Sequence, residues 1–193
     1  MRACRVAGVT AVALVGGPLV TGCAGSADPQ SSPNRTAPTG GHSRPLRLPE
    51  SDGMSTLLVR TDYSDDSAGQ AAVDAVTAVH DSADDESFGA LMQVVEAPEL
   101  DGLTPEDLAL LPRAGYLSLL AVADARTMID HTIVFVDLSE HNEQVGRTFR
   151  AVPREVEPIT VNLALANMDF FDFADAADPD GVFRGFAAPE PEA

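Results

Sequence analysis

Short apolar runs along the chain predict the strands of a sheet. Thr56 to Arg60 is one run, and Phe88 to Glu96 contains a second. Tyr116 to Ala123 and Thr132 to Leu138 are almost continuously apolar, which is typical of central strands that are buried on both faces. Gly146 to Val152 alternates between polar and apolar residues. It predicts an edge strand that pairs with the preceding strand as a hairpin.

Helical patterns lie between and after these runs. One helix is expected from about Ser67 to His80, behind acidic capping residues. A second is expected to begin with Thr104 as its N-cap and to stop at Pro112. From Pro158 onward, apolar residues recur at helical spacing and predict one or two helices against the sheet. The order of elements predicts a single small layered α/β domain, with helices packed on a mixed sheet of about five strands.

The N-terminal segment has a different pattern. Two arginines precede an apolar stretch from Val6 to Val20, which is too short and too interrupted by Gly and Pro for a transmembrane helix. Residues 1–22 are therefore predicted to be a signal peptide. The tetrapeptide Val20-Thr21-Gly22-Cys23 resembles a bacterial lipobox. That resemblance implies cleavage before Cys23 and a lipid on its sulfur, which would hold the protein on the outer face of the cell membrane.

The remaining boundaries follow from composition. Residues 23–53 comprise the lipidated cysteine and a segment rich in Ser, Pro, Gly and Thr, which predicts a disordered tether. The α/β domain is expected at 54–186, followed by a tail at 187–193. Met54 stands directly before the first predicted strand. An alternative is therefore that translation starts at Met54 and that the protein is cytoplasmic.

The net charge of the chain limits the classes of partner that it can bind. There are 30 acidic against 12 basic residues, a formal net charge of −18. Residues 54–193 contain 27 acids and seven arginines, a net charge of −20. This excess argues against binding of nucleic acid, because the phosphates would be repelled. It is compatible with a solvated surface that confers solubility, with a basic protein partner, or with divalent cations.

Three segments resemble a known family. They are Leu57 to Asp66 (LLVRTDYSDD), Gly146 to Arg150 (GRTFR) and Ala166 to Phe186 (ANMDFFDFADAADPDGVFRGF). They are similar to an uncharacterised actinobacterial family known only as a domain of unknown function. The resemblance implies a small α/β domain, usually without a leader and with no assigned catalytic residues. Members tend to have a bulky aromatic residue in the first helix, about where this chain has Gly69.

No catalytic motif for a nucleophile elbow, a phosphate-binding loop or a helical zinc site is present in the sequence. The strongest candidate chemistry is a set of three aspartates, Asp62, Asp124 and Asp137, each after a predicted strand. If those strands are parallel neighbours, the carboxylates converge at one edge of the sheet and can bind Mg²⁺. Aspartate is also common at strand ends and helix caps for structural reasons.

Two hypotheses follow for the domain behind the anchor. The leading one is a non-catalytic domain that presents an acidic face to another protein, with no cofactor. The rival is a metal-dependent hydrolase that uses Asp62, Asp124 and Asp137 to hold Mg²⁺.

Overall fold

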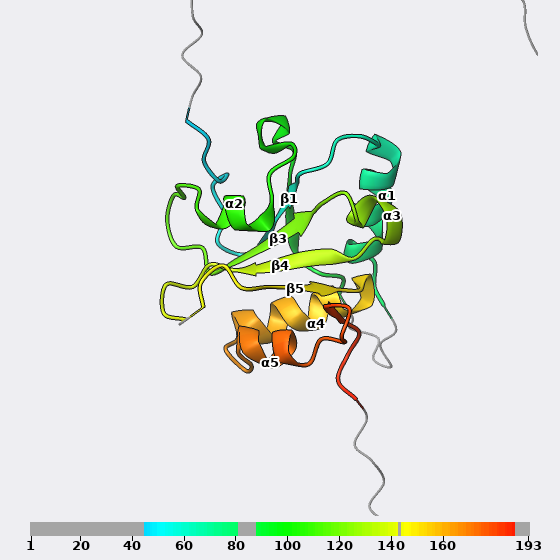
Figure 1. The fold of residues 1–193 in the computed structure, drawn as a ribbon. Helices are drawn as coiled ribbons and strands as arrows, with labels where there is room; N and C mark the ends of the chain where they lie inside the picture. The colour runs from blue at the N-terminus through cyan, green and yellow to red at the C-terminus, as the bar shows by residue number, and fades with distance from the viewer. Residues whose placement is uncertain (1–44, 81–87, 143, 188–193) are drawn as a thin grey trace, which may run out of the picture. The chain divides into compact units, whose positions relative to one another are not determined.

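The computed structural model describes residues 45–80, 88–142 and 144–187 (Figure 1). Cys23, the predicted signal peptide and most of the predicted tether lie outside these residues, as does nearly all of the tail. Within the described chain, no helix has the length and apolar character needed to cross a membrane.

Six strands form one mixed sheet, which confirms the predicted single α/β domain. They are β1 (Thr56–Arg60), β2 (Met92–Val95), β3 (Leu119–Ala123), β4 (Ile133–Asp137), β5 (Thr148–Ala151) and β6 (Val182–Phe183), in the spatial order β2-β1-β3-β4-β5-β6. β1 is parallel to both β2 and β3, whereas β4 is antiparallel to β3 and β5. β6 is parallel to β5 and covers its outer side. The prediction that β5 is an edge strand is therefore wrong, while its hairpin with β4 is confirmed.

The first helix and the helix capped by Thr104 lie close to where the sequence predicts them, but the short helical segments 98–100 and 127–130 were not predicted. Six helical segments are described. They are α1 (Asp66–Thr77), the 3-10 turn η1 (Pro98–Leu100), α2 (Pro105–Ala109), α3 (Thr127–Asp130), α4 (Pro153–Ala164) and α5 (Phe170–Asp175). Asp65 caps α1 by accepting from the Ala68 backbone N–H at 3.0 Å, and Thr104 with Asp107 forms the capping box of α2. α4 starts five residues before Pro158, because Pro153 takes the first helical position.

Alternating side chains of the strands build two separate cores. On β1, Leu58 points to one face, and Leu57 and Val59 point to the other. The Leu58 face is covered by α1, α4 and α5, which supply Val76, Val156, Ile159, Phe170 and Phe173. The other face is covered by η1, α2 and the segment before β1. Figure 1 shows α2 on one side of the sheet and α4 and α5 on the opposite side.

Part of the predicted tether belongs to the folded domain. Leu48 is only 1% exposed and packs in the same core as Leu57 and Val59. Its backbone N–H donates to the Pro112 carbonyl at 2.9 Å. A little further on, the Asp52 N–H donates to the Gln93 side chain at 2.7 Å. The predicted start of the folded domain at residue 54 is therefore too late. Burial of Leu48 holds this segment on the domain although the residues around it are mostly polar.

Candidate functional site

The topology creates a crevice between the C-terminal ends of β1 and β3. From β1 the chain passes through α1, on one face of the sheet, to β2. From β2 it returns through η1 and α2, on the other face, to β3. The segment after β2 crosses the C-terminal end of β1, where the Gly102 N–H donates to the Thr61 carbonyl at 2.9 Å. Open α/β sheets place their ligands at the C-terminal ends of parallel strands. A cleft of about 490 Å³ lies there, lined by residues that include Asp62, Asp101, Thr104 and Asp124.

Asp62 lines this cleft, and only one of its carboxylate oxygens accepts hydrogen bonds from described residues. One oxygen accepts a hydrogen bond from the Ser64 backbone N–H at 2.8 Å, and the Ser64 hydroxyl donates to the same oxygen. These bonds from Ser64 hold the pKa of Asp62 below its usual value. The immediate role of Asp62 is thus to form the turn that leads from β1 to α1.

Asp124 is committed to internal bonds. Its Oδ1 accepts from the backbone N–H groups of Arg126 and Thr127 and from the Thr127 hydroxyl, at 3.0 to 3.1 Å. Both oxygens also accept from the Arg150 guanidinium, which reaches over from β5. Burial alone would raise the pKa of Asp124, but Arg150 and Thr127 outweigh burial and lower it. Asp124 therefore links β3, α3 and β5 as a structural element.

Asp137 does not join the other two aspartates. β4 is antiparallel to β3, and Asp137 pairs with Leu119, the first residue of β3, at the opposite edge of the sheet. Its buried carboxylate accepts from the Ser139 N–H at 2.9 Å and from the Asn142 amide at 2.6 Å. The expected convergence of three strand-end aspartates is therefore wrong for Asp137, because β4 runs the other way.

This geometry leaves little free oxygen for a metal ion. Mg²⁺ requires several oxygen ligands in near-octahedral geometry. The described residues contain no group of three or more His, Cys, Asp or Glu that could hold a metal. Binding of Mg²⁺ by Asp62 and Asp124 stays a prediction, and it requires the ion to compete with Arg150 for the Asp124 carboxylate.

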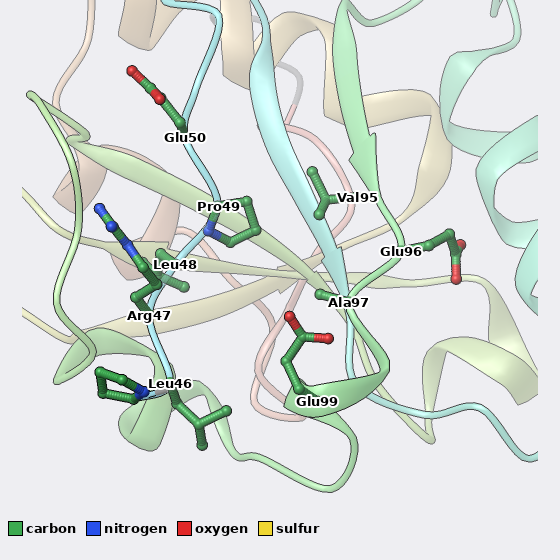
Figure 2. Close-up of a pocket in the computed structure, with 10 residues that line it drawn as sticks. Leu46, Arg47, Leu48, Pro49, Glu50, Val95, Glu96, Ala97 and Glu99 are labelled. Carbon is green, nitrogen blue, oxygen red and sulfur yellow. The ribbon is translucent and has the colours of Figure 1, made fainter. Parts of the chain in front are cut away.

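A second concave surface lies between residues 45–50 and residues 95–99 (Figure 2). We call it the N-terminal groove; its volume is about 750 Å³. Its apolar lining consists of Pro45, Leu46, Leu48, Pro49, Val95 and Ala97, and its charged lining residues are Arg47, Glu50, Glu96 and Glu99. Sequence reasoning missed this groove because it placed residues 45–53 in a tether. The signal was the alternation of Leu46 and Leu48 with Arg47 between two prolines.

All seven arginines of residues 54–193 face carboxylates of the same chain, whereas Arg47, in the segment before β1, forms no ion pair with a described residue. Arg60 pairs with Asp66 and Glu96, Arg113 with Glu140, Arg126 with Asp130, Arg147 with Asp175, Arg150 with Asp124, Arg154 with Glu155, and Arg184 with Asp178 and Asp180. Nine carboxylates take part in these pairs, against 27 acids in residues 54–193. The domain's own cations therefore cannot neutralise its acidic surface.

Comparison with known proteins gives a family but no activity. A family model described as a domain of unknown function (DUF6924) matches residues 55–186. No curated protein and no solved structure matches the chain.

Proposed function

We propose that this chain, which belongs to the DUF6924 family, is a lipid-anchored binding domain that recognises a basic protein partner rather than catalysing a reaction. The observation that carries the binding role is the pairing of all seven arginines of residues 54–193 with carboxylates while a large acidic excess remains. A cationic partner gains from that excess through attraction before and during encounter.

The state of the strand-end aspartates also favours binding over catalysis. A general acid or base, or a metal ligand, needs a carboxylate that is free to meet substrate or ion. Asp124 is held by Arg150 and Thr127, and Asp137 is held by Ser139 and Asn142 at the other edge of the sheet. Of the three aspartates in the hydrolase hypothesis, only Asp62 has a carboxylate oxygen that accepts no hydrogen bond from a described residue.

The support for a lipid anchor is the sequence of residues 1–23, with Cys23 at the end of a leader-like segment. The buried position of Leu48 adds to it. A cytoplasmic protein that started at Met54 would lack Leu48 and leave a gap in the core beside Leu57 and Val59. Translation from a start upstream of Leu48 is therefore favoured.

Fatty-acid labelling in a bacterial host tests the anchor. Wild-type protein should incorporate the label and partition into detergent, and Cys23→Ser should do neither. Cys4→Ser is the matched control, because Cys4 lies within the predicted signal peptide and is removed with it. Labelling of the Cys23→Ser protein, or a native chain that begins at Met54 by intact mass, would refute the lipoprotein assignment.

Affinity capture from cell envelopes tests the binding role. The mature protein should retain basic proteins at about 20 mM salt and release them at about 500 mM, because added salt shortens the screening length. Capture that is unchanged between the two salt concentrations, or no capture of basic proteins, would leave the acidity as a solubility feature and end this proposal.

A further inference from the structure

We propose that the N-terminal groove is the docking site for the partner, and that its occupant is an extended segment in which apolar side chains alternate with arginine or lysine. This inference rests on the proposed function, and it adds the position and the chemistry of the contact.

The apolar lining gives the groove a reason to be covered. Leu46 is 39% exposed although it sits beside buried Leu48, and Pro49, Val95 and Ala97 continue the apolar surface across the groove. An apolar side chain placed there removes its own surface and that of the groove from water. The volume of about 750 Å³ lies within the range of pockets that hold ligands, roughly 300 to 1,000 Å³.

The charges around the groove select a cationic segment. Figure 2 shows the Glu99 carboxylate pointing toward Ala97. The Glu50 and Glu96 carboxylates lie at the margins of the groove and point outward. Glu50 and Glu99 form no ion pair with any described residue, and Glu96 lies 3.8 Å from Arg60, a loose contact. Arg47 is the cation among the lining residues, and its side chain points away from Val95 and Ala97 (Figure 2). Arginine or lysine beside an inserted apolar residue would meet these glutamates.

Both walls of the groove are already held in place. On one side, the Leu48 N–H donates to the Pro112 carbonyl, and the Gln93 amide donates to the Glu50 carbonyl at 3.0 Å. On the other side, the Ala97 N–H donates to the Tyr63 hydroxyl at 2.7 Å. A groove formed in advance costs little ordering on binding. Its N-terminal wall is itself without helix or strand from residue 45 to 52, so an extended segment can lie along it.

The experiment measures binding of a labelled peptide of about ten residues, in which arginine alternates with leucine, to the full chain in non-ionic detergent. A second peptide carries glutamate in place of every arginine. The arginine peptide should bind at about 20 mM salt and weaken at about 500 mM, and the glutamate peptide should not bind. Amide resonances of Val95, Glu96, Ala97 and Glu99 should shift on titration with the arginine peptide.

Two variants of the groove have matched controls elsewhere. Leu46→Lys should weaken binding of the arginine peptide about tenfold, because it removes apolar contact and adds repulsion. Leu110→Lys is its control: it changes an 85% exposed leucine outside the groove and should have no effect on binding. Glu99→Arg should weaken binding of the arginine peptide by a similar factor. It should not increase the salt dependence of that binding. Glu106→Arg, in the exposed first turn of α2, is its control.

Failure of this inference is distinguishable from failure of the proposed function. If envelope partners bind in a salt-dependent way but are insensitive to Leu46→Lys and Glu99→Arg, the partner docks elsewhere and the groove assignment falls alone. If the wild-type protein does not bind the arginine peptide at low salt, the groove assignment also falls. Equal binding of both peptides would show apolar adhesion without charge selection and would overturn it too.

Discussion

The guanidinium group of Arg60 lies against the backbone of α1 at Gly69. A Cβ built on Gly69 would stand 2.7 Å from the Arg60 Cζ, so the glycine leaves the space that the arginine occupies. Arg60 is 7% exposed; its Nε donates to the Asp62 carbonyl at 2.6 Å, and its guanidinium lies 4.6 Å from the centroid of the Tyr63 ring. The aromatic residue that the family resemblance implies near this position would displace Arg60.

We expect Gly69→Ala to destabilise the protein by about 1 to 2 kcal/mol, although the same change at an open helical site stabilises by up to about 1 kcal/mol. The cause is the contact with Arg60, which is held by several partners and cannot move freely. Urea denaturation measures the change. In an Arg60→Ala background, Gly69→Ala should recover its helix-stabilising effect. An equal effect in both backgrounds would show that the two residues are not coupled.

We expect Leu48→Ala to lower the free energy of unfolding by about 2 to 5 kcal/mol, as for other fully buried leucines. Leu46→Ala, two residues earlier and 39% exposed, is the control and should cost less than about 1 kcal/mol. Thermal or urea unfolding distinguishes the two. Equal, small effects would mean that the packed domain begins only at residue 54, as the sequence predicts.

We expect Arg150→Met to cost about 2 to 3 kcal/mol, because it leaves the Asp124 carboxylate, 24% exposed, without its cation. Arg126→Met removes the more exposed pair with Asp130 and should cost at most about 0.5 kcal/mol. Urea denaturation near pH 7 measures both. Similar values for the two variants would contradict the structural role of the Asp124–Arg150 pair.

The lowered pKa of Asp124 predicts a specific pH dependence. Burial opposes this lowering, and the bonds from Arg150 and Thr127 produce it. A carboxylate with a depressed folded pKa contributes stability above its unfolded pKa of about 3.9 and loses it as the pH falls through the folded value. Asp124→Asn should therefore destabilise the protein most above about pH 4, and the difference from wild type should shrink in acid. A difference that is constant with pH would contradict this linkage.

The pKa of Asp180, in the turn before β6, can be measured directly. Hydrogen bonds from Arg184 lower the pKa of Asp180 to about 2. In Arg184→Ala, carboxyl NMR should find the Asp180 pKa raised toward its unperturbed value of about 3.9, with the hydrogen bond from the Val182 backbone N–H still lowering it. An unchanged Asp180 pKa in the variant would exclude Arg184 as the cause. The pair is exposed, so stability should hardly change.

Local patterns were enough to place most of the elements. The apolar runs of β3 and β4, the Thr104 cap of α2 and the hairpin of β4 with β5 depend on neighbours in sequence, and each is confirmed. The strand β6 (Val182–Phe183) was not predicted from the sequence. A strand of two residues is too short to show an alternating pattern in the sequence. The pairing of β6 with β5 is therefore known only from the structure.

The sequence by itself determined that the domain is α/β, acidic and without a recognisable catalytic motif, because composition and short-range periodicity carry that information. Only the tertiary structure decided which distant residues meet. The antiparallel direction of β4 places Asp137 away from Asp62 and Asp124. Arg150 binds Asp124, which lies 26 positions earlier in the sequence. Leu48 is part of the core because it packs with Leu57, Val59 and Ala97. Such contacts depend on long-range packing, which the residues around each partner do not encode.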